Sequence, residues 1–121
     1  LKFAFQGEFS QQQSGEAVRQ HVANVLQHEV LHVAVDRPIK TIAWCSGGAQ
    51  SYMNLAVEAG VDAYLTGEAS EYNFHQAKEN DIHFFAAGHH ATERYGVQAL
   101  GQHLAEKFAL QHQFIDVDNP I

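Results

Sequence analysis

A short segment in the second half of the chain carries residues that suit metal binding. Residues 88–93 read Gly-His-His-Ala-Thr-Glu and follow an apolar run, which places His89 and Glu93 four residues apart in the first turn of a predicted helix. Side chains at this spacing lie on one helix face, with Cβ atoms about 5 to 6 Å apart. An imidazole and a carboxylate at that separation suit Zn, Fe, Mn or Ni. A surface ion pair is the other interpretation, because a glutamate is also favourable near a helix N-terminus.

A second carboxylate–imidazole pair with the same spacing lies in an earlier predicted helix. Glu71 and His75 follow Gly67 and Glu68, which come directly after an apolar strand pattern. Either His75 faces the same cleft as His89, or it lies on a solvated helix face in an ordinary ion pair. A catalytic metal needs three or more protein ligands, so further donors must come from elsewhere in the fold or from outside this chain.

The segment 45–50, Cys-Ser-Gly-Gly-Ala-Gln, joins a predicted strand to a predicted helix. It either presents backbone N–H groups to an anion at the helix N-terminus or forms a plain tight turn. The segment matches neither the dinucleotide fingerprint nor the phosphate-binding P-loop. Cys45 has no histidine at catalytic spacing and is predicted to lie in the core. The other histidines are scattered and are predicted to be surface or core residues rather than ligands: His21, His28, His32, His83, His103 and His112.

The elements that must position these residues are alternating strands and helices. Strand patterns are predicted at 3–9, 31–35, 40–45, 63–66, 82–87 and 114–117, and helices at 14–28, 50–59, 67–79 and 89–108. Ser14 is the predicted N-cap of the first helix, Gly60 a helix stop, and Gln11–Gln13 a loop. This alternation predicts an α/β fold, a layered domain with a mostly parallel or mixed sheet flanked by helices. Ligands collect beyond the carboxyl ends of such strands, which directs attention to loops 46–48, 67–68 and 88–89.

Composition limits the class of protein. A length of 121 residues suits a single α/β domain, 1–121, and 45% apolar with 17% charged residues argues against disorder. A net charge of −7 without any run of Lys or Arg argues against a nucleic-acid groove or an anionic membrane surface. One cysteine, no apolar 18-residue stretch and no signal-like segment predict a cytoplasmic protein. The chain starts at Leu1 and its only methionine is Met53, which we interpret as part of a longer protein.

Three segments in order carry a resemblance to a known family. They are 43–48 (Ala-Trp-Cys-Ser-Gly-Gly), 60–68 (Gly-Val-Asp-Ala-Tyr-Leu-Thr-Gly-Glu) and 86–94 (Ala-Ala-Gly-His-His-Ala-Thr-Glu-Arg). Together they closely resemble the C-terminal half of the NGG-interacting-factor-three-like family, whose bacterial members are called GTP cyclohydrolase I type 2 homologues. The resemblance extends from about Phe3 to Pro120.

The resemblance implies a site and an assembly. Members of this family are α/β proteins that bind two divalent metal ions between their halves and form hexameric rings, so it implies a homo-oligomer. It implies that His89 and Glu93 are metal ligands, that Thr92 takes the motif's hydroxyl position, and that Glu68 and His75 are the acidic residue and the histidine near the cleft. The other ligands, a His-His pair and an Asp, would belong to the half that this chain lacks.

The function predicted on this basis is a dinuclear metal-dependent hydrolase of unknown substrate. Its metals would activate a bound water, and Glu68 or His75 would transfer a proton. Nucleotides and other phosphoesters are the small molecules to test as substrates. The alternative is a non-enzymatic metal-binding interaction or regulatory module built as an oligomeric ring, and a third is a nucleotide-binding domain without metal. A pocket beside the metals with an anion-binding loop at 46–48 would favour the enzyme, whereas an exposed apolar patch would favour the interaction module.

Overall fold

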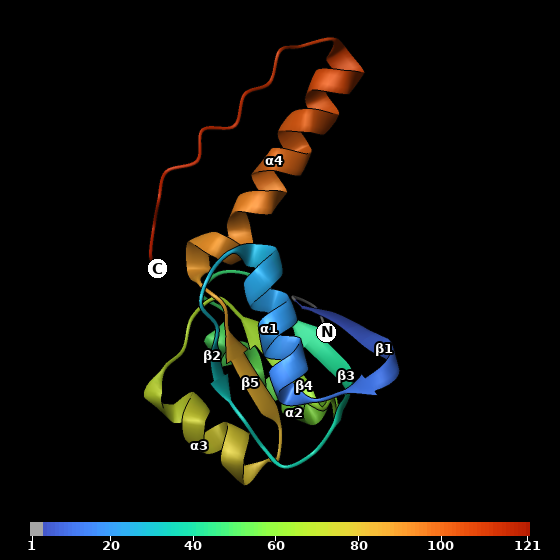
Figure 1. Cartoon of the computed structure of the whole chain (residues 1–121), viewed down its shortest axis with the longest axis vertical. Coiled ribbons are helices and arrows are strands. Elements are labelled where there is room, and N and C mark those ends of the chain that lie inside the picture. Colours follow the sequence, from blue (N-terminus) through green and yellow to red (C-terminus); the bar gives the residue numbers. More distant parts are fainter. Residues whose placement is uncertain (1–3) are drawn as a thin grey trace.

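Five strands form a mixed sheet in the order β1-β3-β4-β5-β2 in a computed structural model that describes residues 4–121 (Figure 1). Along the chain the elements are β1 (Phe5–Gln13), α1 (Gly15–Leu26), β2 (Leu31–Val33), β3 (Ile39–Trp44), the 3-10 turn η1 (Gln50–Tyr52), α2 (Met53–Glu58), β4 (Ala63–Thr66), α3 (Glu71–Glu79), β5 (His83–Ala86) and α4 (His89–Phe108). Strands β3, β4 and β5 are parallel, and β1 and β2 pair with them antiparallel at the two edges. The predicted α/β fold with a mostly parallel or mixed sheet is therefore confirmed.

Each face of the sheet is covered by its own helices. Because successive side chains of a strand point to opposite faces, Phe84 contributes to one layer and Phe85 to the other. On one face α2 and α3 pack over a buried cluster that includes Met53, Ala77 and Phe84. On the other face α1 packs over a cluster that includes Val18 and Phe85. Both phenylalanines are fully buried, so β5 contributes to both layers of the core.

Helix ends in the first half of the chain follow local signals. The Ser14 side chain accepts a hydrogen bond from the Ala17 N–H, which confirms the predicted N-cap of α1. Gly60 has φ +68° and follows α2, as expected of a C-terminal stop. The helix predicted over 50–59 instead consists of the η1 turn followed by the six residues of α2.

Helix α3 begins later than the sequence pattern suggests. The prediction starts this helix at Gly67, whereas α3 begins at Glu71. The local reason is Ser70, whose backbone N–H donates to the Asn73 side chain at 2.8 Å, so the first turn is capped at this point. As a result Glu68 lies in a loop at the edge of the sheet rather than on a helix.

The two ends of the described chain differ from prediction. Strand β1 continues through Gln11–Gln13, which were predicted to be a loop, and its register against β3 shifts between Glu8 and Gln13. Phe3, the first residue of the predicted strand, lies outside the described residues.

The strand predicted at 114–117 is wrong. Residues 109–121 form no helix or strand and run back beside α4 (Figure 1). Arg94 holds the Asp116 carboxylate at 3.2 Å, and the backbone carbonyl of Ile121 accepts a hydrogen bond from the His90 N–H at 2.9 Å. An apolar, β-branched pattern favours a strand only where tertiary placement brings the segment beside a sheet, and these contacts hold Asp116 and Ile121 against the start of α4 instead. None of the helices described between residues 4 and 121 combines the length and apolar character needed to cross a membrane.

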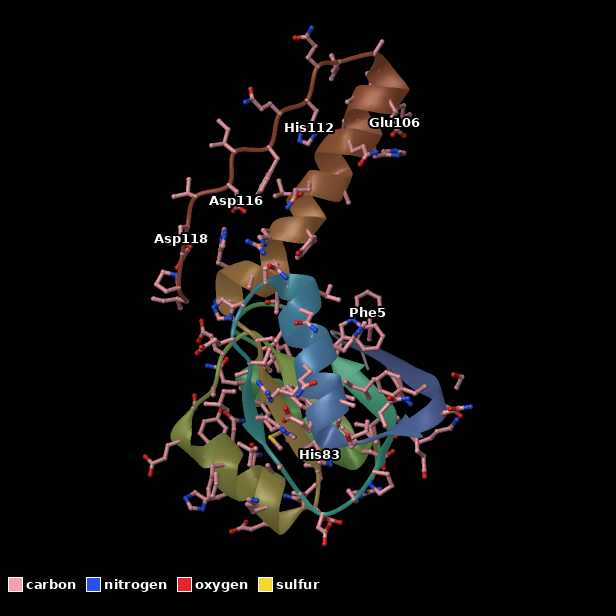
Figure 2. All side chains as sticks on the ribbon, in the orientation of Figure 1. Phe5, His83, Glu106, His112, Asp116 and Asp118 are labelled. Atoms are coloured by element: carbon pink, nitrogen blue, oxygen red, sulfur yellow. The ribbon has the colours of Figure 1, made fainter. Side chains whose placement is uncertain are left out.

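A pair of histidines lies under the start of α1, where Figure 2 labels His83. His83 is only 2% exposed, and its Nδ1 is 2.9 Å from Nε2 of His32. Its Nε2–H donates to the Arg37 carbonyl at 2.8 Å, so Nδ1 of His83 accepts the proton that His32 donates. A Cβ added at Gly15 would lie 2.7 Å from both rings, so the helix backbone closes over the pair.

This pair predicts that acid destabilises the fold. Burial, with a smaller contribution from His83, lowers the pKa of His32 to about 4, whereas an unfolded histidine titrates near 6.5. The unfolded state therefore binds more protons between these values, and the stabilisation is complete above pH 6.5 and lost as the pH falls toward 4. We expect roughly 2 kcal/mol of loss in the free energy of unfolding over that range, after allowance for solvent screening.

Urea denaturation at several pH values measures this slope. In a His32→Gln variant, whose amide retains a donor without a titrating ring, the slope between pH 6.5 and 4.5 should become shallower. Equal slopes in both proteins would contradict the prediction.

Candidate functional site

Three loops meet at the carboxyl edge of the parallel strands. The Gly67 N–H donates to the Gly47 carbonyl at 2.9 Å, and the Gly88 N–H donates to the Gly67 carbonyl at 2.9 Å. A Cβ added at Gly67 would lie 2.7 Å from the Gly47 oxygen and 2.8 Å from Cα of His89. We call Gly47, Gly67 and Gly88 the glycine ladder. A side chain at Gly67 would force these loops apart, so this close approach and the two main-chain hydrogen bonds fix the backbone from which the candidate site residues project.

The ring of His89 lies between two carboxylates. Its Nδ1 is 2.5 Å from Oε1 of Glu68, and its Nε2 is 3.2 Å from Oε2 of Glu93. The side chains of Glu68, His89 and Glu93 are 37%, 39% and 53% exposed, so solvent and ligands can reach them. The structure thus brings together three of the four residues that the sequence singled out.

Glu68 is held on both of its oxygens. Oε1 faces His89, and Oε2 accepts a hydrogen bond from the Gln50 side-chain amide at 3.2 Å. The hydrogen bond with His89 lowers the pKa of Glu68, and the same bond raises the pKa of His89. Glu68 is therefore a carboxylate that favours a proton on Nδ1 of His89, which leaves Nε2 directed toward Glu93. Sequence reasoning missed Gln50, whose only signal was its position just after the loop 46–48.

Gly47 leaves space for the Glu93 carboxylate. Its φ is +69°, and an added Cβ would lie 2.1 Å from Oε1 of Glu93 and 3.1 Å from Nε2 of His89. The pairing of His89 with Glu93 therefore depends on the absence of a side chain at this position.

Thr92 joins two of the loops. Its hydroxyl accepts from the Gly47 N–H at 2.9 Å and donates to the Gly88 carbonyl at 2.9 Å. The Ala49 N–H is also occupied, since it donates to the Gly47 carbonyl at 3.0 Å. These bonds favour the tight-turn interpretation of segment 45–50 over an anion-binding one, because the N–H groups of Gly47 and Ala49 already have acceptors.

His75 is not part of this arrangement. It is exposed on α3, where its ring packs edge-on against Phe74 with 5.4 Å between centroids. Helix α3 lies toward the end of the sheet opposite the start of α4 (Figure 1). No contact among the described residues joins His75 to the His89 ring, and no ion pair in that part of the chain joins it to Glu71. The solvated-face interpretation of the Glu71 and His75 pair is the one that the structure favours.

The donor set suits part of a metal's coordination shell. Nε2 of His89 and the carboxylate of Glu93 are nitrogen and oxygen donors close enough to share one ion, as the helical spacing predicted. Within residues 4–121, no group of three or more His, Cys, Asp or Glu side chains is arranged to hold a metal. In this part of the chain, His89 and Glu93 are thus a pair of donors that is too small to hold a metal by itself.

Comparison with known proteins places the chain in a family. The model of the family described as Duf34/NIF3 (NGG1p interacting factor 3) matches residues 1–120. The chain belongs to this family. One Duf34/NIF3 relative, the GTP cyclohydrolase 1 type 2 homolog of Pseudomonas aeruginosa, is 61% identical over 100 residues, which cover 83% of this chain and 40% of the relative.

Other Duf34/NIF3 relatives agree in sequence and in fold. The GTP cyclohydrolase 1 type 2 homolog of Vibrio cholerae is 47% identical over 95% of this chain and 47% of its own length. The solved structure of protein ybgI, described as of unknown function, is 39% identical with a TM-score of 0.93 over 98% of this chain and 49% of that chain. The chain thus spans about half, or less, of the length of these relatives.

Proposed function

We propose that this chain supplies His89 and Glu93 as two ligands of a divalent metal centre in a metal-dependent hydrolase, and that the centre is dinuclear. The remaining ligands would come from outside this chain, which spans about half, or less, of the length of its relatives. The observation that carries the proposal is the ring of His89, whose Nδ1 is bound by Glu68 while Nε2 points toward Glu93. Metal-binding histidines commonly have this arrangement, with a carboxylate on the nitrogen that does not bind the metal.

Each residue of the group would have a separate task. His89 and Glu93 would hold the metal, which supplies an activated water and polarises the bond under attack. Glu68 would keep the Nδ1 proton in place and fix the ring orientation, and Gln50 would orient Glu68. A direct proton transfer by Glu68 would compete with this orienting role, because Oε1 is occupied by the ring and its lowered pKa makes the carboxylate a weaker base.

The substrate class is inferred from the relatives' names. Proteins called GTP cyclohydrolase 1 type 2 homologs match the chain over most of its length, which supports a nucleotide as the substrate. Other phosphoesters are included because a dinuclear centre of this kind can clamp both oxygens of a phosphoryl displacement. The metal is Zn, Fe, Mn or Ni, because one nitrogen and one carboxylate donor do not discriminate among them.

A second candidate function, a metal-binding interaction module in a ring, is favoured by α4. Of its 20 residues only Ala91 is buried, and Val97, Leu100 and Phe108 are 57–58% exposed. Exposed apolar surface of this kind marks protein contacts, so α4 supports a homo-oligomer such as a hexameric ring under either function.

Metal dependence of hydrolysis separates the two candidates. A protein of the relatives' length that contains this chain should lose phosphoester or nucleotide hydrolysis when chelated and regain it with one of the four metals. A protein that binds metal and assembles, yet hydrolyses none of a broad nucleotide and phosphoester panel, would support the interaction module instead.

A further inference from the structure

A cavity of about 300 Å³ lies between α1 and the sheet, beside the candidate metal centre. Val22 and Val25 line it from α1, and Ile42, Trp44 and Leu65 line it from β3 and β4. At one end it reaches Ser46 and Thr92, which adjoin Gly47 and Glu93 in sequence. A volume of this size is at the lower limit of small-molecule pockets, so it suits one ring system rather than a large ligand.

Trp44, the only tryptophan of the chain, gives this cavity a flat wall. Its ring stacks on Phe5, labelled in Figure 2, with 6.0 Å between centroids and 23° between planes. A Cβ added at Gly7 would lie 3.2 Å from the six-membered ring of Trp44. Strand β1 therefore supports the indole, yet Trp44 remains 39% exposed. An indole that is held in place by β1 and is still exposed to solvent can stack against a flat ring of a ligand.

The chemistry of the lining favours an uncharged occupant. Among residues 4–121, no Lys, Arg, Asp or Glu side chain lines this cavity, and His21 is the one ionisable side chain on its wall. A cation would therefore lose its hydration without an acidic partner, and an anion would meet a single imidazole. The Thr92 hydroxyl is occupied by Gly47 and Gly88. The Ser46 hydroxyl has no hydrogen bond within the described part of the chain, so it can bind one polar atom of a ligand.

We propose that this cavity binds a flat, uncharged aromatic or heteroaromatic ring, stacked on Trp44 with a polar edge at Ser46. A substituent on that edge would extend past Gly47 toward His89 and Glu93, because the Glu93 carboxylate lies directly against Gly47. The inference rests on the proposed function for the role of the bound ring, but binding of the ring requires no metal.

The test uses the indole N–H resonance of Trp44, which is the single tryptophan signal in a two-dimensional proton–nitrogen NMR spectrum of this chain. The probes are benzamide and cyclohexanecarboxamide, which share an amide and differ in whether the ring is flat. We expect benzamide to shift this resonance saturably, with a Kd on the order of 1 mM as befits a fragment, and to bind at least fivefold more tightly than cyclohexanecarboxamide.

Two valine variants with similar exposure provide the control. Val25→Phe fills the cavity, whereas Val97→Phe makes the same change on α4, and the two valines are 54% and 58% exposed. V25F should weaken benzamide binding at least fivefold, and V97F should leave it unchanged. Equal binding of the two probes, no shift, or an unchanged Kd in V25F would overturn the proposal.

The outcomes also separate this proposal from the metal site. An indole signal that moves with protein concentration alone, and stops doing so in V25F, would show that a second copy covers the cavity and would overturn the ring proposal. Benzamide binding that persists in chelated protein supports the proposal even if metal binding and hydrolysis fail. Retained metal binding without any benzamide shift would overturn this inference and leave the proposed function intact.

Discussion

A His89→Ala variant is expected to bind divalent metal at least tenfold more weakly than the wild-type protein, with an unchanged thermal unfolding midpoint. Among residues 4–121, His89 and Glu93 are the pair placed to share one ion, so this substitution removes one of the two proposed ligands. The side chain is 39% exposed in the first turn of α4, so its removal leaves no cavity in the core. Competition with a chromogenic chelator, in this chain and in a protein of the relatives' length that contains it, measures the affinity.

His90→Ala is the matched control. This histidine is the next residue on the same helix, but its Nε2 faces Asp116 at 3.4 Å rather than the site, so metal affinity should not change. A Glu68→Gln variant should fall between the two, because the amide oxygen still accepts from Nδ1 but the charge is lost. Equal metal content in H89A and H90A would refute the assignment of His89 as a ligand.

A Gly47→Ala variant is expected to lose at least tenfold in metal affinity although position 47 provides no ligand. The new Cβ would lie 2.1 Å from Oε1 of Glu93, so the carboxylate must move away from Nε2 of His89. Since the end of a glutamate side chain moves easily, the steric conflict displaces the ligand rather than the fold. The positive φ adds a loss of about 1–2 kcal/mol in the free energy of unfolding.

Gly60→Ala separates these two effects. Gly60 has φ +68°, close to the +69° of Gly47, but an added Cβ there meets nothing within 4 Å. The two variants should therefore lose similar stability in urea denaturation, whereas only G47A should lose metal affinity. A metal affinity for G47A equal to that of G60A would show that Glu93 does not bind the metal through the position it occupies here.

The elements of the fold that were predictable are those whose signals are local. Helix α4 begins at His89, directly after Gly88, as the sequence predicted. Helix α1 begins after its predicted N-cap, Ser14. The strand at 114–117 was predicted in error because an apolar pattern indicates what a segment favours, whereas contacts with α4 decide where this segment lies. The late start of α3 has a similar origin, since the cap at Ser70 and Asn73 outweighs the apparent opening at Gly67.

The candidate site was predictable in part. The spacing of His89 and Glu93 was enough to place them on one face of a helix, but the contact of Glu68 with His89 depends on the sheet register and joins residues 21 apart. Asp62 lies in segment 60–68 with Glu68 but has a structural role. Burial raises the pKa of its carboxyl, but hydrogen bonds from Thr41 and Lys40 outweigh this effect, so the pKa is lowered overall. Sequence spacing did not distinguish these two carboxylates.

The glycine ladder has a consequence for how sequence change would affect this protein. Its three loops are joined by main-chain bonds, so the position of the candidate site does not depend on which apolar side chains fill the layers below. A substitution in those layers would change how much of the protein is folded, while every folded molecule would keep the same site. Substitutions in the core would therefore change the amount of folded protein without changing the site. Substitutions at the three glycines of the ladder would change both.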